Sequence, residues 1–519
     1  MGELFLWDGA AYEAILPEGA CDRPLVRTAP RQGDAVLPLV WKELPSFWVQ
    51  KGIWQLNEGA SALAEMSVER QRELWRMSGL SVKEGLPHER LFVVEVCNLE
   101  PLSVTRIYER RRQKAALPMS AYSIGENLHG QGRSINNQGR EDPYNQDRSI
   151  NNQCSEDLYD QDRSINNQGK EGAAIWRSSR AGDWPGDAAL RRVARVAVRA
   201  LYTLRLDVGE AEVALAGDGR CAVRGVRPLL SDGARQSAAL RRFAATLGAA
   251  GALDEDRRIL LGADPEFALL MPSGKVAPAS RFFGAGAGGA AGADAVLLGR
   301  RLLYPVAELR PAPAESPAAL AGNIRRLMLA AAAKVRDPGL RWVAGAMPVP
   351  GLALGGHIHI SGAPLTGRLL RLLDSCAAYP LAMVEDPAGR GRRPRYGSLG
   401  DFRLQPHGGF EYRTLPSWLV SPAAAKAAFA LALLCAREAL TLPRVPAAEE
   451  RFRAAYYAGD RSELSACLDD VADVVTRSAS YEELAPCIEP LFQAARAGKT
   501  WDEKSDFRLK WKIPLPQTD

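Results

Sequence analysis

Residues able to do chemistry recur at two-residue spacing on four strand-like runs between positions 259 and 413. Residues i and i+2 of a strand point to the same face, so each pair projects two side chains into one space. The pairs are Asp264 with Glu266, Glu308 with Arg310, His357 with His359, and Glu411 with Arg413. Oxygen-rich ligation with one or two imidazoles suits a magnesium or manganese ion that carries phosphates. The set therefore predicts a site for a divalent metal ion and a phosphorylated ligand.

Each pair taken alone also fits a structural interpretation. Asp264 and Glu266 fit solvated acids at a strand end, and Glu308 with Arg310 fits a surface ion pair. The histidine pair is more specific, because the chain has only five histidines and these two follow a pair of glycines. A same-face pair in that setting favours binding of a metal or a phosphate.

Residues 385–418 form a loop rich in glycine and arginine. Its arginines are Arg390, Arg392, Arg393, Arg395 and Arg403. Guanidinium groups match phosphate oxygens in shape and charge, which favours a polyphosphate ligand. A solvated basic loop accounts well for Arg390 and Arg392. It does not account for Glu411 and Arg413, which repeat the Glu-x-Arg pattern of the second pair.

The elements that must position these residues follow from the sequence pattern. The strand-like runs are 259–270, 304–313 and 354–361. Ser316 and Pro317 have the types preferred at an N-cap and at the first helical position, which predicts a helix from there. The apolar run 423–440 indicates a buried helix, because Lys426 and Arg437 interrupt it and a bilayer span needs about 20 apolar residues.

The sequence pattern before residue 250 predicts a strand, a helix and a hairpin. Residues 91–97 are strand-like, and 187–202 have apolar residues at the three- and four-residue spacing of an amphipathic helix. Two strand-like runs follow, 206–215 and 220–226, joined by a Gly-Asp-Gly turn at 217–219. Between the strand and the helix, RSINNQ repeats at Arg133, Arg148 and Arg163. These units offer too few apolar residues to offset chain entropy, so we expect a disordered insertion over 126–172.

Composition narrows the class of protein. The 519 residues have a net charge of +5, too small for a polybasic nucleic-acid arm. Eight cysteines without a CxxC pair exclude a disulfide scaffold and a zinc ribbon, and indicate reduced thiols. The N-terminus lacks the basic and apolar regions of a signal peptide. We therefore expect a cytoplasmic protein with no membrane segment and no nucleic-acid partner.

The four motifs, in this order, resemble the glutamine synthetase / glutamate–cysteine ligase superfamily, and most of all its phage-type COOH–NH2 ligase (amidoligase) branch. GADPEFALL is similar to the family's GPEPEFFLF strand, GGHIHIS to GMHVHQS, and FEYRTLP to VEYRxxD. The resemblance covers about 255–440. It implies an α+β fold, in which a curved antiparallel sheet carries helices on its outer face and the active site on its concave face.

The resemblance also implies roles for individual residues. The implied metal ligands are Asp264, Glu266, Glu308, His357 and Glu411. His359 would lie near the nucleotide phosphates, Arg395 and Arg403 would bind phosphate, and Arg413 would contact substrate or phosphate. Asp264 is shorter than the family's Glu, and Glu315 is a weak candidate for a further metal carboxylate.

The helix and hairpin at 187–226 resemble the end of an ATP-grasp domain. Asp207 and Glu212 fit the first strand of that family, but Arg224 and Arg227 stand where its metal-binding Glu and Asn are expected. Two cations there would repel magnesium. We therefore expect a degenerate ATP-grasp-like domain over 1–250.

The resulting hypothesis is an ATP- and Mg²⁺- (or Mn²⁺-) dependent ligase that joins a carboxylate to an amine through an acyl phosphate. Its catalytic domain would cover 255–440, with a helical extension over 441–519, and it could act as an oligomer. Residues 284–292 fit a mobile cover or a plain flexible loop. The substrates would be small molecules or peptides. The alternatives are a catalytically inactive scaffold built from decayed ligase domains and a metal-dependent hydrolase.

Overall fold

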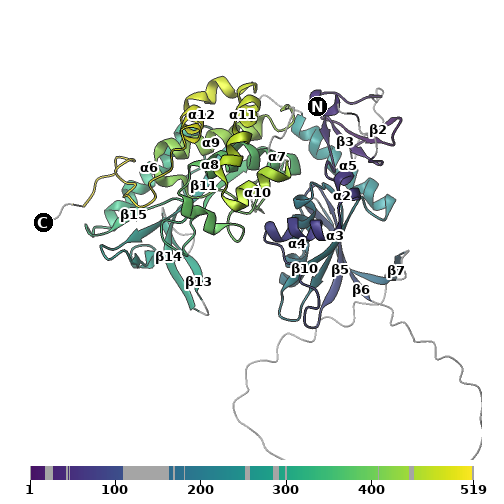
Figure 1. Ribbon diagram of the computed structural model, residues 1–519, viewed down its shortest axis with the longest axis horizontal. Helices are drawn as coiled ribbons and strands as arrows, with labels where there is room; N and C mark the ends of the chain where they lie inside the picture. The colour runs from purple at the N-terminus through teal and green to yellow at the C-terminus, as the bar shows by residue number, and fades with distance from the viewer. Residues whose placement is uncertain are drawn as a thin grey trace, which may run out of the picture.

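The chain folds into an N-terminal part built on two β-sheets and a C-terminal part built on a third sheet and most of the helices (Figure 1). The computed structural model describes residues 2–17, 27–41, 45, 47–108, 163–166, 170–180, 182–251, 258–284, 291–298, 301–406, 408–442 and 449–516. In the view of Figure 1 the N-terminal part lies on the right and the C-terminal part on the left.

The C-terminal sheet is antiparallel, with strand order β13-β14-β11-β16-β18-β17 and with β12 and β15 paired to β11. Its strands are β11 (Leu260–Leu270), β12 (Val276–Ala277), β13 (Ala291–Leu298), β14 (Arg301–Leu309), β15 (Arg341–Val343), β16 (Gly356–Ser361), β17 (Phe402–Leu404) and β18 (Phe410–Tyr412). Each strand-like run of the sequence therefore forms a strand. The α+β fold with an antiparallel sheet is confirmed.

The two faces of this sheet differ in polarity. Phe267, Ile358 and Ile360 are fully buried on one face, within the main hydrophobic core that the helices share. The helices of this part are α6 (Pro317–Lys334), α7 (Gly367–Leu373), α8 (Tyr379–Val384), α9 (Pro422–Arg437), α10 (Glu450–Ala458), α11 (Arg461–Thr476) and α12 (Tyr481–Arg496), with a π-helical turn η2 (Asp374–Ala378) and short 3-10 turns η1 (Ala279–Arg281), η3 (Pro387–Arg392) and η4 (Trp418–Val420). The opposite face carries the ionisable pairs.

Local signals placed the helix starts correctly. The Ser316 hydroxyl accepts a hydrogen bond from the Ala319 N–H and caps α6, and Pro317 is its first residue. The apolar run became α9, whose residues from Ala427 to Cys435 are almost fully buried. Among the described residues, no helix combines the length and apolarity needed to cross a membrane. The six described cysteines are free thiols.

The six-stranded sheet of the N-terminal part is also antiparallel, in the order β10-β9-β5-β6-β8-β7. Its strands are β5 (Arg90–Cys97), β6 (Glu100–Tyr108), β7 (Arg163–Asn166), β8 (Lys170–Arg177), β9 (Val208–Leu215) and β10 (Cys221–Pro228). Helix α4 (Ala188–Thr203) packs on it and is capped by Asp187. The predicted helix and hairpin are thereby confirmed, whereas the ATP-grasp-like resemblance stays a prediction.

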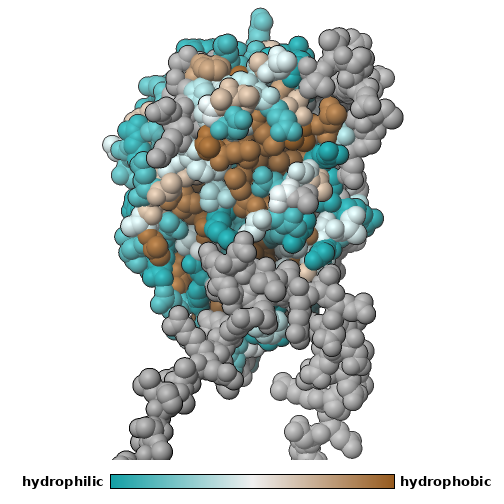
Figure 2. All heavy atoms as spheres, turned by 90° about the vertical axis from the view of Figure 1, so that its right-hand side faces the viewer, coloured by the Kyte–Doolittle hydropathy of each residue, from teal (hydrophilic) through white to brown (hydrophobic). Residues whose placement is uncertain are grey.

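A small sheet precedes it, with strand order β2-β1-β3-β4. Its elements and the nearby helices are β1 (Leu4–Trp7), β2 (Tyr12–Ile15), β3 (Ala35–Pro38), β4 (Trp54–Gln55), α1 (Phe47–Gln50), α2 (Ala60–Glu65), α3 (Val68–Met77) and α5 (Gly233–Gly251). Buried Leu4, Trp54, Phe243 and Leu247 join this sheet to α5. Figure 2 views the molecule from the side of the N-terminal part and shows apolar side chains gathered there among hydrophilic ones.

The repeat-bearing insertion falls mostly outside the described residues. Of the expected disordered range 126–172, the structure describes only 163–166, which form β7, and 170–172, which begin β8. The third RSINNQ unit therefore contributes an edge strand. A strand can add to a sheet edge through backbone hydrogen bonds, without the apolar face that the repeat lacks.

Buried polar contacts join the two parts of the chain. Arg371 of α7 forms an ion pair with Asp207, at 2.8 Å between Nη1 and Oδ1, and both side chains are buried. The Tyr202 hydroxyl of α4 donates to Asp374 at 2.7 Å. Arg199 of α4 donates to the Ser398 hydroxyl at 2.9 Å. Helix α4 is therefore held firmly against the C-terminal part.

The segment after α12 returns to the C-terminal sheet. The Trp511 indole N–H donates to the Leu419 carbonyl at 2.7 Å, and buried Glu503 accepts the N–H groups of Met347 and Asp386. Burial raises the pKa of Glu503 to about 7. Backbone hydrogen bonds to its carboxylate only partly offset this loss of hydration.

The pKa of Glu503 predicts a pH-dependent stability. The folded protein holds this proton up to about pH 7, whereas the unfolded chain loses it near the ordinary pKa of a glutamate. The stability from this group is therefore present at low pH and is lost as pH rises, by about 3 kcal/mol in all. Glu503→Gln removes this titration. Denaturant unfolding from pH 4.5 to 7.5 should show its stability relative to wild type increasing with pH, and a constant difference would contradict the prediction.

Candidate functional site

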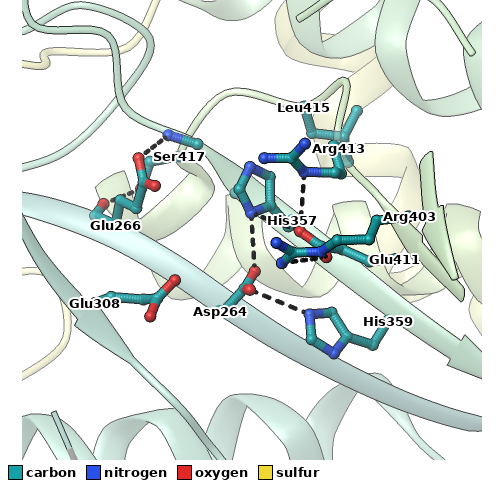
Figure 3. A network of polar contacts seen from close by, with 12 residues as sticks. Asp264, Glu266, Glu308, His357, His359, Arg403, Glu411, Arg413, Leu415 and Ser417 are labelled. Atoms are coloured by element: carbon teal, nitrogen blue, oxygen red, sulfur yellow. Dashed lines mark hydrogen bonds and ion pairs between the residues drawn. The ribbon is translucent and has the colours of Figure 1, made fainter. Parts of the chain in front are cut away.

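The strand register of the C-terminal sheet places the ionisable residues side by side on one face. Asp264 of β11 lies opposite His357 of β16, and His359 lies opposite Glu411 of β18. On the other edge of β11, Glu266 lies opposite Glu308 of β14. Residues opposite one another in an antiparallel pair share a face, so these side chains converge (Figure 3).

The closest cluster is formed by Asp264, His357 and Glu411. The His357 Nδ1 atom lies 3.1 Å from Asp264 Oδ1 and 3.1 Å from Glu411 Oε1. His359 Nε2 lies 3.2 Å from Asp264 Oδ2 on the other side (Figure 3). The Glu411 side chain is completely buried, and those of Asp264 and His357 are nearly so.

The donor atoms of this cluster have the arrangement of metal ligands. Asp264, His357 and Glu411 each offer one ligand atom, and these atoms lie within 4.8 Å of one another. Donor atoms about 3 Å apart correspond to adjacent ligands of an octahedral ion bound at about 2.1 Å. Among the described residues, the buried atoms Asp264 Oδ1, His357 Nδ1 and His359 Nε2 meet only the ion-pair contacts within this cluster, and none of these contacts has hydrogen-bond geometry. Buried polar atoms of this kind are rare unless a ligand satisfies them, so the cluster fits a metal ion.

The carboxylates of the cluster and His357 shift one another's pKa values. Burial works against the charged forms of all three groups. The imidazoles of His357 and His359 nevertheless hold the pKa of Asp264 well below its usual range. The contacts with Asp264 and Glu411 raise the pKa of His357 to about 10, and His357 lowers the pKa of Glu411. The protonated His357 therefore offsets one of the two negative charges of Asp264 and Glu411.

A second group of carboxylates lies beside the first. Burial, followed by the negative charge of Asp264, raises the pKa of Glu308 to about 7. Burial also raises the pKa of Glu266, and Asp294 of β13 adds to both effects. Asp294 was missed at the sequence level because its strand has no second ionisable residue at i±2. Arg310 pairs with Glu308, and a further cation would be needed for Glu266 and Glu308 to be charged together.

Two of the predicted arginines reach the cluster. Arg403 donates to Glu411 Oε2, and Arg413 donates to Glu411 Oε1 at 3.1 Å (Figure 3). Arg310 forms an ion pair with Glu308. Arg395, in contrast, is exposed and stacks over the ring of Tyr396. No ion pair among the described residues joins Arg395 to the cluster.

The interpretation of Arg392 as part of a solvated loop is wrong. This residue is only 2% exposed and donates to the carbonyls of Thr414 and Leu415. Arg393 is also buried, in an ion pair with Glu385. Their guanidinium groups fix the loop to the strand end instead of facing solvent, which the local glycine-rich composition did not indicate.

Other predicted candidates lie apart from the cluster. Glu315 is exposed and pairs with Arg258. Residues 285–290 of the expected cover at 284–292 lie outside the described part of the chain. In the N-terminal part, Arg224 and Arg227 pair with Glu89 and Glu210. The cations expected to repel magnesium there are thus engaged in ion pairs.

Glycines leave room for the two imidazoles. A Cβ atom on Gly355 would lie 2.6 Å from His357 Nε2, and one on Gly262 would lie 3.3 Å from His359 Cβ. The Gly355 N–H also donates to Glu266 at 2.6 Å. A glycine is therefore needed before the histidine strand for space, whereas the backbone N–H that positions Glu266 does not depend on the residue type.

Gly355→Ala should displace the His357 ring, because the added methyl cannot share its position. We expect the affinity for Mn²⁺ to fall about 10- to 100-fold, the range seen when the orientation of metal ligands is disturbed. Calorimetric titration with Mn²⁺ measures this. Gly322→Ala, where a Cβ meets no atom within 4 Å, is the matched control. Equal Mn²⁺ affinity of the two variants would contradict the prediction.

A comparison with known proteins gives one family match, in the C-terminal part of the chain. Residues 261–513 match the model of a family described as phage phiEco32-like COOH.NH2 ligase-type 2. The match confirms the resemblance seen in the motifs, over these residues. The match continues past residue 440, through the helices and the returning tail.

Solved structures add distant similarities. A bifunctional glutathione synthetase from Pasteurella multocida has 10% sequence identity and a TM-score of 0.31, with 49% of this chain and 52% of that chain covered. A ligand-free GmaS has 13% identity and a TM-score of 0.28, covering 49% and 70%. A glutamine synthase homolog has 15% identity and a TM-score of 0.23, covering 55% and 73%. The chain thus spans about half the length of the glutathione synthetase, and no curated protein matches it.

Proposed function

We propose that the protein is an ATP-dependent carboxylate–amine ligase that forms an amide or peptide bond. The observation that carries this proposal is the cluster of Asp264, His357 and Glu411, whose buried donor atoms converge on the sheet of a half-chain from a COOH.NH2 ligase family. The substrates would be a small-molecule or peptide carboxylate and an amine.

The metal site would be held mainly by that cluster. Asp264, His357 and Glu411 would be direct ligands, and Glu266 with Glu308 would supply further carboxylates from the same face. The oxygen-rich set suits Mg²⁺ or Mn²⁺. When bound, such an ion neutralises charge on phosphate oxygens. His359 would lie near the phosphates of the nucleotide.

The arginines would act on the transferring phosphoryl group. Arg403 and Arg413 already point at Glu411, so their remaining N–H groups lie beside the cluster. They would stabilise the charge that develops as the substrate carboxylate attacks the γ-phosphorus of ATP and releases ADP. Arg395 would have to move from its exposed position to take part.

The second half of the reaction forms the amide. The amine attacks the carbonyl carbon of the acyl phosphate, phosphate leaves, and the amine loses a proton. Because water hydrolyses acyl phosphates, the site has to exclude solvent until the amine is bound. The near-complete burial of Glu411 and His357 supports such a site.

The test is an assay of the full-length protein with ATP, Mg²⁺ and a panel of amino acids and short peptides. We expect phosphate release that depends on an acceptor pair, and an amide product identified by mass spectrometry. Glu266→Ala should abolish phosphate release and amide formation. Glu482→Ala is the control and should leave both unchanged, because Glu482 lies in the first turn of α12 and not on the sheet. No phosphate release with any acceptor, together with unchanged nucleotide binding in Glu266→Ala, would reject the ligase.

The two alternatives give other results. A scaffold of decayed domains would show no metal-dependent heat with Mg²⁺–ATP in calorimetry. A hydrolase would act with zinc and without nucleotide. Nothing among the described residues favours the hydrolase, which leaves Arg403 and Arg413 without a role.

A further inference from the structure

A cleft of about 650 Å³ lies between helix α4 and the strand end at β17. One wall comes from the N-terminal part and the other from the sheet that carries the cluster; Figure 1 shows α4 on the side of the N-terminal part that faces the C-terminal part. Six arginines line the cleft: Arg191, Arg192, Arg195, Arg199, Arg403 and Arg413. Four come from α4, outside the residues that match the ligase family.

No acid among the described residues forms an ion pair with the arginines of the α4 wall. Arg191 donates to the carbonyls of Pro185 and Gly186, and Arg192 to the carbonyl of Gly219. Arg199 donates to a carbonyl and a hydroxyl. Neutral acceptors of this kind orient a guanidinium without removing its charge. Among the described residues that line the cleft, Asp401 is the only acid.

Arg195 is the most exceptional of the six. No hydrogen bond or ion pair joins its guanidinium to another described residue. Partial burial and the positive charges of Arg191, Arg413 and Arg403 lower its pKa, and the negative charge of Asp401 offsets them only in part. A cation held against other cations costs stability, unless an anionic ligand occupies the space between them.

The cleft also has apolar and aromatic walls. Trp184, Val196 and Phe402 line it with the arginines, and the Trp184 indole N–H is buried without an acceptor among the described residues. The cleft is therefore large enough and mixed enough for an organic ligand, and not only for a small inorganic ion.

We propose that this cleft binds a substrate carrying two or more neighbouring oxyanions, with Arg195 as the contact supplied by the N-terminal part. The proposal rests on the proposed ligase function. Arg403 and Arg413 line the cleft and also donate to Glu411, so an anion bound here lies next to the metal cluster. Two substrates of such a ligase have this chemistry: the triphosphate of the nucleotide, and an acid with several carboxylates such as an acidic peptide.

Direct binding tests the cleft without turnover. The full-length protein is titrated by calorimetry with sodium tripolyphosphate and, separately, with tetraglutamate, in metal-free buffer containing a chelator. Arg195→Gln should weaken binding of at least one probe about tenfold or more, the effect of losing a hydrogen bond to a charged group. Arg195→Lys should retain part of the affinity. Arg477→Gln, which removes the same charge from the exposed C-cap of α11, should bind as wild type does.

Thermal melting separates a binding role from a structural one. Arg195→Gln should melt at the same temperature as wild type or higher, because the substitution relieves repulsion. A response to tripolyphosphate alone assigns the cleft to the nucleotide, and a response to tetraglutamate alone assigns it to the acid substrate. If neither probe binds, or if Arg195→Gln and Arg477→Gln behave alike, the proposal is overturned. Binding that responds to Arg195 in a protein without ligase activity would reject the proposed function alone.

Discussion

Asp264→Asn is expected to reduce ligation at least about a thousandfold and to weaken Mn²⁺ binding at least about a hundredfold. The side chain keeps its size but loses the charge that faces both His357 and His359. Glu411 and His357 would remain as a pair, with one fewer anionic ligand for a cation. The loss of metal and of its electrostatic stabilisation accounts for the size of the effect.

Two measurements check this expectation. Calorimetry with Mn²⁺ reports the metal site, and amide formation in the ligase assay reports catalysis. Asp473→Asn is the control, because this aspartate is exposed and pairs only with Arg477 among the described residues. Wild-type affinity for Mn²⁺ in Asp264→Asn would exclude this residue as a ligand.

Arg371→Ala is expected to lower the free energy of unfolding by about 3–5 kcal/mol, the usual cost of breaking a buried ion pair from one side. Its guanidinium lies 2.8 Å from Asp207, and both side chains are buried where the two parts of the chain meet. The substitution leaves the Asp207 charge buried, with the Asn57 N–H as its one remaining hydrogen-bond donor among the described residues. It also removes the stacking of Arg371 on the ring of Tyr202.

Denaturant unfolding of the two full-length proteins measures this cost. Arg437→Ala is the matched control, because its partner Glu483 is exposed and surface pairs of this kind contribute about 1 kcal/mol or less. Similar midpoints for Arg371→Ala and wild type would show that the ion pair does not hold the two parts together. The same pair positions α4, so its loss should also weaken anion binding in the arginine cleft.

The arginine cleft suggests why the residues that match the ligase family are joined to an N-terminal part. Arg403 and Arg413 both form ion pairs with Glu411, so the sheet by itself offers a ligand little unpaired positive charge. Helix α4 adds four arginines opposite them, and its contacts through Tyr202 and Arg199 hold it in place. We infer that the N-terminal part completes the substrate site, whatever its evolutionary origin.

Local sequence patterns were sufficient for the elements and for the faces of the strands. The two-residue spacing of His357 and His359 placed both imidazoles on one face, and Ile358 and Ile360 are fully buried on the other. Ser316 caps α6, as its residue type predicted, and Asp187 caps α4, at the start of the predicted amphipathic helix. These features depend on neighbours within a few residues, so the sequence determined them.

Only the tertiary structure decided which faces meet. Asp264 lies opposite His357, and Glu266 opposite Glu308, through hydrogen bonds between strands separated by dozens of residues. That register brought in Asp294, which no local pattern marked, and packing buried Arg392 instead of leaving it in solvent. The same holds for Arg195, whose α4 spacing predicted only an amphipathic helix. Spacing along a chain determines the direction of a side chain, whereas its partners depend on the packing and pairing of distant segments.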